Sequence, residues 1–386
     1  MNFSLTEKEE ALRQEVRDFI RQGQSQKFPS ELPGEYSWGD WSAAYNRRLG
    51  AGGWISMAWP KEYGGQGRTL MEQFIFLEEM VYHKAPILSF LFVNCAARGV
   101  LTYGNERLKS ELLPQIARGE LTFWQGFSEP NAGSDLLGLE TRAVEDGDTY
   151  IVNGQKVWNS FANLADYGIT LAKTDTEAPR HKGISAFLID MKLPGITVRP
   201  LMCMPGDTAF TEIFFDDVRV PKYYLLGEKN RGLPLLLGGL EADRLWARGP
   251  MFAGFKRILE QLVQYVKETG RQDDPIIRQE LAEMATEIEV SRLLGYRAAC
   301  MINEGREMKY EASMVKTFAD ELGQRLYNTG MKIMGLYSQF GQESKWAPLK
   351  DVAHEYLFSF GLTLAGGSSE IQRSTIATRG LGLPRE

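Results

Sequence analysis

The fold is decided by the stretch between Leu121 and Val220, which contains the segments Thr149-Tyr-Ile-Val-Asn153, Gly168-Ile-Thr-Leu-Ala-Lys173, Ile184-Ser-Ala-Phe-Leu-Ile-Asp190 and Thr211-Glu-Ile-Phe-Phe-Asp-Asp-Val218. These segments are short and rich in β-branched and aromatic residues, which is typical of strands. Turn dipeptides such as Asp146-Gly147 and Asn153-Gly154 separate them. Because no helical pattern lies between the strands, the stretch predicts an antiparallel barrel or sandwich.

Helical patterns flank this β region on both sides. At the amino end, Thr6 and Glu9 have the spacing of a capping box, and an amphipathic run follows them. A loop rich in Pro, Gly and Trp is expected over Phe28–Trp41. Further helices are expected over Trp41–Leu49, Leu70–Val81, Leu88–Tyr103, Arg107–Arg118, Leu235–Glu268, Pro275–Glu304, Ser313–Met334 and Ser369–Arg379.

This order predicts an α+β multidomain protein. Its parts are an N-terminal α-helical domain (1–120), a middle antiparallel β domain (121–232) and a C-terminal α-helical domain (233–386).

Composition excludes several classes of protein. Of 386 residues, 43% are hydrophobic and 24% charged, the balance of a globular chain. Acidic residues outnumber basic ones, 50 to 44, so a nucleic-acid partner has little support. No apolar run is long enough to span a membrane, and the polar, acidic start of the chain gives no sign of a targeting peptide. The three cysteines are widely spaced and the three histidines lack metal-ligand spacing, so we expect a cytoplasmic protein without a metal.

Four motifs carry a resemblance to a known family. They are Phe127-Ser-Glu-Pro-Asn-Ala-Gly-Ser-Asp135, Asn153-Gly-Gln-Lys-Val-Trp-Asn-Ser160, Phe214-Phe-Asp-Asp-Val-Arg-Val-Pro221 and Gly366-Gly-Ser-Ser-Glu-Ile-Gln-Arg373. In this order and at these separations they resemble the acyl-CoA dehydrogenase family of flavoproteins, over nearly the whole chain. The resemblance implies that the middle domain is an antiparallel β-barrel and that the C-terminal domain is four-helix-bundle-like. Taken singly, the first motif is also an ordinary turn sequence, and a Trp after a strand is more often core than cofactor wall.

The resemblance implies an FAD site. Ser128 would bond the pyrimidine edge of the flavin, Trp158 would cover one face of the ring, and Ser160 would reach N5. Gly133 would permit close backbone approach, and Ser134 would contact the pantetheine arm or the flavin phosphate region. Further cofactor contacts implied by the same motifs and by the matching C-terminal segments are Phe127, Arg271, Lys332, Gly335, Gly367 and Ser368.

The family's reaction is α,β-dehydrogenation of an acyl-CoA, in which a carboxylate removes the α-proton while the β-hydrogen leaves as hydride to flavin N5. In many members the base is a Glu in the C-terminal loop, where this chain has Gly366. Other members carry it on the first long C-terminal helix, and the matching residue here is Asp243. Glu241 faces the other side of that helix, and Glu370 is explained by its place at a helix start, where Ser369 and Gln372 form a plausible capping box.

The surroundings expected for Asp243 are apolar. One helical turn away in either direction lie Gly239, Leu240, Trp246 and Ala247. Desolvation on such a face raises a carboxyl pKa and strengthens the base. The resemblance places Ser134, Leu240, Arg244 and Gly366 against the substrate.

The far half of the FAD site departs from the family pattern. The stretches Thr269-Gly-Arg-Gln-Asp-Asp-Pro275 and Lys332-Ile-Met-Gly-Leu336 replace an Arg-x-x-Phe-Gly segment and a Gln-x-x-Gly-Gly loop. The first form resembles actinobacterial-type members that act on steroid or alicyclic side chains, some of which pair as unlike subunits.

The sequence therefore predicts an FAD-dependent acyl-CoA dehydrogenase acting on an alicyclic, steroid-side-chain or branched acyl group. Electron-transferring flavoprotein would accept the electrons, and the assembly would be a homotetramer or a heterotetramer with a related subunit. Two alternatives stay open: a non-catalytic or half-site subunit of a heteromeric enzyme, favoured by Gly366, and a flavin monooxygenase or oxidase on the same fold.

Overall fold

The computed structural model describes residues 4–24, 28 and 41–384, and within these it leaves the side chains of 239–243 undescribed. The chain forms two compact units. The β unit comprises Trp41–Gly67 and Leu88–Leu240, and the helical unit comprises Met1–Asp40, Arg68–Ile87 and Glu241–Glu386. The boundaries predicted at 120 and 232 stay a prediction. The loop predicted over Phe28–Trp41 lies outside the described residues, except for Phe28 and Trp41 themselves.

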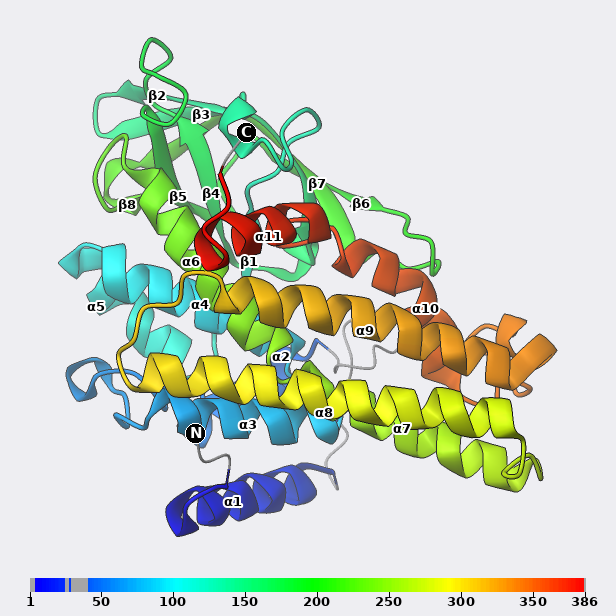
Figure 1. Cartoon of the computed structure of the whole chain (residues 1–386). Helices are drawn as coiled ribbons and strands as arrows, with labels where there is room; N and C mark the ends of the chain where they lie inside the picture. The colour runs from blue at the N-terminus through cyan, green and yellow to red at the C-terminus, as the bar shows by residue number, and fades with distance from the viewer. Residues whose placement is uncertain (1–3, 25–27, 29–40, 385–386) are drawn as a thin grey trace. The chain divides into compact units, whose positions relative to one another are not determined.

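The β unit is built on one sheet of eight strands (Figure 1). The strands are β1 (Phe123–Gly126), β2 (Arg142–Asp146), β3 (Thr149–Ser160), β4 (Tyr167–Lys173), β5 (Ile184–Asp190), β6 (Ile196–Leu201), β7 (Phe210–Pro221) and β8 (Leu225–Leu226). Their order is β6-β7-β3-β2-β4-β5-β8, with β1 paired to β4. All pairings are antiparallel except β1 with β4 and β2 with β4.

Helices complete the β unit. They are α2 (Ala43–Ala51), α4 (Leu88–Tyr103), α5 (Glu106–Ala117), the first half of α6 (Gly232–Arg248), and the short 3-10 turns η1 (Lys61–Tyr63), η2 (Leu136–Gly138), η3 (Ala162–Leu164) and η4 (Lys222–Tyr224). Helix α4 packs on β1, where Phe123 and Trp124 are fully buried. This packing forms one side of the core on which the loop after β1 rests.

The helical unit is a bundle. It contains α1 (Glu7–Gln24), α3 (Leu70–Tyr82), the second half of α6, α7 (Met251–Glu268), α8 (Pro275–Asn303), α9 (Glu311–Met334), η5 (Gly335–Gln339), α10 (Lys350–Leu362), α11 (Ser369–Thr375) and η6 (Ile376–Gly380), a π-helical turn. Figure 1 shows α7, α8 and α9 running side by side, and α10 packs on α9. The predicted order of helical, β and helical regions is confirmed.

One predicted helix is wrong, and one helix was not predicted. A single helix was expected over Leu235–Glu268, but α6 ends at Arg248 and α7 begins at Met251. The break falls at Gly249 and Pro250, because proline lacks the N–H that a continuous helix requires. Helix α10 was not predicted.

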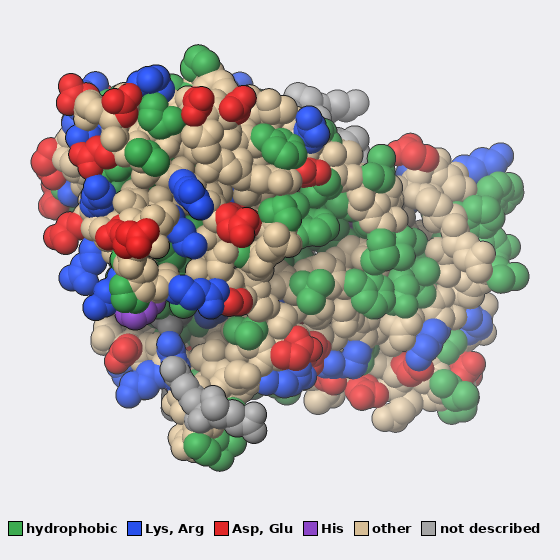
Figure 2. All heavy atoms as spheres, turned by 90° about the horizontal axis from the view of Figure 1, so that it is seen from above, with side chains coloured by type: hydrophobic (Ala, Val, Ile, Leu, Met, Phe, Trp, Pro, Cys, Tyr) green, Lys and Arg blue, Asp and Glu red, His purple; other side chains and the backbone are tan. Residues whose placement is uncertain are grey.

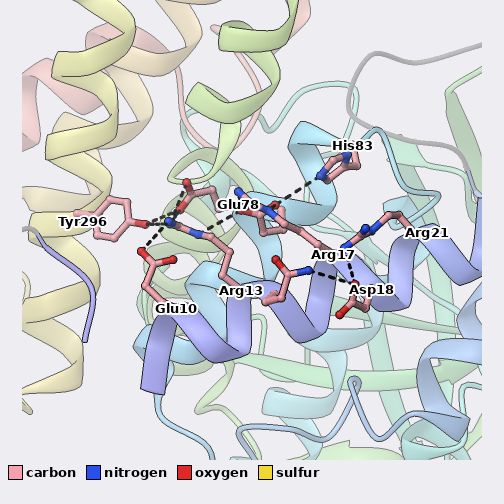
Figure 3. Close-up of polar contacts among 10 residues, drawn as sticks. Glu10, Arg13, Arg17, Asp18, Arg21, Glu78, His83 and Tyr296 are labelled. Atoms are coloured by element: carbon pink, nitrogen blue, oxygen red, sulfur yellow. Dashed lines mark hydrogen bonds and ion pairs between the residues drawn. The ribbon is translucent and has the colours of Figure 1, made fainter. Parts of the chain in front are cut away.

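Helix α1 is held to the bundle by a polar cluster (Figure 3). Arg17 donates to Glu79 of α3 at 2.8 and 2.9 Å, and Arg13 contacts Glu78 and Glu79. Tyr296 of α8 donates to Glu78. Burial alone raises the pKa of Glu79, but hydrogen bonds from His83 and Arg17 and the charges of both arginines hold it below its usual range.

At the start of α1, the predicted capping box is confirmed. The backbone N–H of Thr6 donates to Glu9 at 2.8 Å, and the N–H of Glu9 donates to the Thr6 hydroxyl at 3.3 Å.

The surface mixes charges of both signs. Figure 2 shows one face on which basic and acidic side chains are interspersed, and the formal net charge is −6. Among the helices that the structure describes, none has the length and apolar character needed to cross a membrane. Within the same residues, no cluster of three His, Cys, Asp or Glu side chains could hold a metal ion.

Candidate functional site

Trp158 is displayed on the surface of the β unit. Trp158 lies on β3, whose pairing with β7 shifts register between Lys156 and Asn159. In this bulge, Trp158 has φ +63°. Left-handed backbone costs a bulky residue roughly 1–2 kcal/mol, so the bulge is enforced by the surrounding sheet. The indole is 63% exposed and meets Phe210 edge-on at 6.2 Å. The alternative that Trp158 is a core residue is therefore wrong.

The loop Phe127–Asp135 runs beside this bulge. The N–H of Val157 donates to the Ser128 carbonyl at 3.0 Å, and Glu129 and Ala132 exchange backbone hydrogen bonds within the loop. Gly133 and Ser134 are exposed, and a Cβ added at Gly133 would meet no atom within 4 Å. The protein's own packing thus does not require glycine there, and open space lies beside the backbone.

A buried ion pair lies under this loop, and the sequence analysis did not assign it. The Lys156 ammonium is 2.7 Å from a Glu129 carboxylate oxygen, and the two side chains are 0% and 5% exposed. Burial lowers the pKa of Lys156 to about 8, although the charge of Glu129 opposes the fall. Burial raises the pKa of Glu129, but the Lys156 charge and hydrogen bonds from Lys156, Thr141 and Glu140 outweigh it and leave the pKa low.

The β unit also contains a mainly apolar cavity of about 180 Å³. Phe127 lines it, together with residues of α4, β1, β4 and the first half of α6, among them Ile169 and Leu235. Arg98 of α4 is part of the lining, and burial lowers its pKa. Sequence reasoning missed this arginine, because nothing in the pattern of α4 indicates which face borders a cavity.

In the helical unit, α6 and the C-terminal loop are joined by an arginine. Asp243 lies within α6, but its side chain and that of Leu240 are outside the described ones. The neighbouring Arg244 donates from Nε to the Gly366 carbonyl at 3.1 Å. One turn further, Arg248 pairs with the fully buried Asp320 at 2.8 Å. Arg244 thus ties the segment of α6 that follows Asp243 to the loop that contains Gly366, and Arg248 ties the same helix to α9.

The C-terminal loop is shaped by glycine. Gly366 and Gly367 have φ of +69° and +97°, and a Cβ on Gly367 would lie 2.4 Å from the Gln372 amide nitrogen. That amide donates to both glycine carbonyls, at 3.2 and 3.1 Å. The side chain of Ser368 caps α11 by accepting from Ile371 N.

The predicted capping box at α11 is wrong by one residue. Ser368 occupies the N-cap, so Ser369 lies inside the helix and Gln372 is used by the glycine loop. Glu370 is exposed, and the Ser368 hydroxyl followed by backbone N–H groups lowers its pKa. A lowered pKa makes Glu370 a weak proton acceptor.

The two stretches predicted for the far half of FAD meet in the helical unit. Arg271, after α7, donates to the Ile333 carbonyl at the end of α9. Lys332 is 3.5 Å from Glu280, and Gly335 has φ +59° with open space around its Cα. Arg271 and Lys332 thus lie near one end of α9, where the charge of Arg271 would attract a phosphate group while that of Lys332 is paired with Glu280.

The candidate site residues divide between the two units. The β unit contains Ser128, Gly133, Ser134, Trp158 and Ser160. The helical unit contains Asp243, Arg244, the 366–368 loop, Arg271, Lys332 and Gly335. On the β unit, the exposed indole, the partly exposed Ser128 and the open space at Gly133 fit the flat, donor-seeking ring of a flavin. This is the type of surface expected of a flavin-dependent enzyme.

Comparison with known proteins gives the family. The chain matches the acyl-CoA dehydrogenase family in three consecutive parts, namely the N-terminal domain over residues 6–120, the middle domain over 125–218 and the C-terminal domain over 230–381. The chain therefore belongs to the acyl-CoA dehydrogenase family and is an oxidoreductase.

Relatives match over all or most of the chain. Acyl-CoA dehydrogenase FadE26 of Mycobacterium tuberculosis is 35% identical, with 100% of this chain and 99% of the relative covered. Acyl-CoA dehydrogenase IpdE1 of the same organism is 33% identical over 89% of this chain and 88% of its own. Among solved structures, the Tcur3481-Tcur3483 steroid ACAD has TM-score 0.90 and 30% identity, with both chains covered completely. The ChsE4-ChsE5 complex from Mycobacterium tuberculosis has TM-score 0.85 and 32% identity, again with complete coverage.

Proposed function

We propose that this chain catalyses the FAD-dependent α,β-dehydrogenation of an acyl-CoA whose acyl group is alicyclic, branched or a steroid side chain. The observation that carries the proposal is the outward-facing Trp158, held at positive φ in a β-bulge beside the Phe127–Asp135 loop. An exposed indole on an ordered strand offers a large apolar face on which a planar ring can stack. The substrate class is supported by the steroid enzyme among the structural neighbours.

Each unit contributes residues that we propose as FAD contacts. On the β unit these are Phe127, Ser128, Gly133, Ser134, Trp158 and Ser160, and on the helical unit Arg271, Lys332, Gly335, Gly367 and Ser368. When bound, FAD supplies a two-electron acceptor for the β-hydrogen and its electron pair.

The chain's own chemical task is to remove the α-proton. We assign this to Asp243, because Gly366 offers no side chain and Glu370 is exposed with a lowered pKa. The Asp243 carboxylate takes the α-proton while the β-hydrogen leaves with its electron pair, so that a Cα–Cβ double bond forms. Arg244 positions this part of α6 through its bond to the Gly366 carbonyl, and Gly366 would present backbone to the thioester. Ser134 and Leu240 would contact other parts of the acyl-CoA.

The apolar cavity of the β unit is suited to the hydrocarbon part of the substrate. It lies against Phe127, at the start of the loop proposed for the flavin, and against Leu236 and Gly238, which precede Asp243 on α6. Its mainly apolar lining suits hydrocarbon rather than the polar CoA part of the substrate.

Partners form part of the same proposal. Electron-transferring flavoprotein would take the electrons in the cytoplasm, and the enzyme would be a tetramer of like chains or of this chain with a related subunit. Two structural neighbours are named as pairs of proteins, which supports the unlike-subunit form. The alternative of a half-site subunit is favoured by Gly366 and by the altered stretch around Arg271.

Anaerobic mixing with a panel of straight, branched and alicyclic acyl-CoAs tests the proposal. Bleaching of the flavin band by one class identifies the substrate, and Asp243→Asn should slow it by about 10²–10⁴-fold while FAD stays bound. A protein that carries FAD but is bleached by no acyl-CoA, alone or with a related subunit, would refute the dehydrogenase assignment. Oxygen consumption by reduced flavin without acyl-CoA would instead support a monooxygenase or oxidase.

A further inference from the structure

A charged pair buried beneath the Phe127–Asp135 loop needs an explanation beyond stability. Lys156 and Glu129 are almost completely withdrawn from water, 2.7 Å apart. Burying two charges costs about as much as their attraction returns, and apolar residues of similar volume often stabilise a core equally well. Such a pair is therefore expected where it fixes one conformation rather than where it adds stability.

The pair fixes the start of the loop through several backbone groups. Glu129 accepts the N–H groups of Glu140 and Thr141, the latter at 3.0 Å, which ties the loop to the chain entering β2. Lys156 donates to the Phe127 carbonyl at 3.3 Å. The ion pair is thus connected to the backbone on both sides of the loop.

These bonds determine which way the peptide groups face. The Phe127 carbonyl is directed to Lys156, and the Ser128 carbonyl is directed to the N–H of Val157 at 3.0 Å. In a trans peptide the carbonyl and the following N–H point in opposite directions. The N–H of Ser128 is therefore directed away from the buried Lys156. Because Ser128 is partly exposed, its N–H and hydroxyl can serve one acceptor together.

We propose that Lys156 and Glu129 are positioning residues that aim the Ser128 N–H and hydroxyl at the pyrimidine edge of the flavin. This inference rests on the proposed FAD site. That edge gains negative charge when the ring is reduced, and donors fixed in place stabilise developing charge better than donors that must reorient. The pair thus strengthens FAD binding and raises the reduction potential of the bound flavin, without touching it.

The pair can be removed without leaving a lone buried charge. The double variant Lys156→Met, Glu129→Gln keeps the side-chain volumes and one acceptor for the N–H groups of Glu140 and Thr141. Glu129→Gln alone keeps the Lys156 bond to the Phe127 carbonyl, so its effect on FAD binding should be smaller. Because it leaves the buried ammonium without its counter-charge, its free energy of unfolding should fall more than that of the double variant. Val220→Ala, at a fully buried position of β7 away from the loop, is the matched control for general loss of stability.

Three quantities are measured on the purified holoprotein and on its apoprotein: the FAD dissociation constant, the reduction potential of the bound flavin, and hydrogen exchange at the Ser128 amide. We expect the double variant to bind FAD at least tenfold more weakly, to have a more negative potential and to lose FAD-dependent protection of Ser128. Val220→Ala should change none of these.

An unchanged FAD affinity and potential in the double variant would overturn the positioning role, as would equal changes in Val220→Ala. If the double variant does not fold, the FAD affinity and reduction potential of Glu129→Gln are compared with wild type instead, and unchanged values overturn the positioning role. A wild-type protein that binds no FAD would refute the proposed function instead, so the two failures are distinguishable.

Discussion

Trp158→Ala is the most direct test of the flavin-face assignment. The variant removes an indole that is 63% exposed and touches Phe210 only edge-on. A large aromatic side chain offers up to about 250 Å², so roughly 150 Å² is open here, and a flat ligand on one face would cover about half of it. At about 25 cal/mol per Å², this burial contributes ~2 kcal/mol, or roughly a thirtyfold change in dissociation constant.

The free energy of unfolding should hardly change, because exposed side chains contribute within about 0.5 kcal/mol. The bulge backbone at φ +63° is as unfavourable for Ala as for Trp. Val144→Ala is the matched control, since Val144 of β2 is also 63% exposed. Both variants are purified, stripped of FAD and titrated with it by fluorescence quenching, with thermal unfolding in parallel. Equal FAD affinity in Trp158→Ala and wild type, at unchanged melting temperature, would refute the reasoning.

Three further predictions follow from the helical unit. Asp243→Glu should keep part of the flavin-bleaching rate, and Glu241→Gln should change it by less than about tenfold in stopped-flow mixing; a collapse in Glu241→Gln would move the base. Because the folded pKa of Glu79 lies below its unfolded value, its stabilising effect is present above the unfolded pKa and is lost as pH falls through the folded pKa. Urea unfolding between pH 6 and about pH 3 should therefore show a smaller pH-dependent loss in Glu79→Gln than in wild type. Gly366→Ala should lower the free energy of unfolding by about 1–2 kcal/mol through left-handed strain, measured by urea denaturation.

Local signals in the sequence predicted much of the secondary structure. Helix α4 and strand β5 have the predicted limits, and the Thr6–Glu9 capping box forms as expected. Caps, periodicity and turn dipeptides act within a few residues, so the sequence displays them directly. The strands β1, β2, β6 and β8 were not predicted. They are short, between two and six residues, and β6 contains a proline, so none of them shows a clear alternation.

The parts of the site that no local pattern displays depend on pairings distant in sequence. Lys156 and Glu129 are 27 residues apart and meet only because β3 runs beneath the loop. The exposure of Trp158 arises from a register shift between β3 and β7, which no local pattern specifies. Arg98 could be placed at a cavity only after α4 was packed on the sheet.

Gly366 illustrates how structure changes the meaning of a sequence difference. In the sequence, Gly366 stands where many family members carry the catalytic Glu, so the chain could be a non-catalytic subunit. In the structure, Gly366 and Gly367 both have left-handed backbone, and Arg244 and Gln372 bind the Gly366 carbonyl from two sides. Asp or Glu at this position would have a strained left-handed backbone, so the conformation of the loop favours glycine. Because Arg244 ties this loop to the turn of α6 that carries Asp243, the arrangement favours a proton acceptor on α6 over a chain that has lost one.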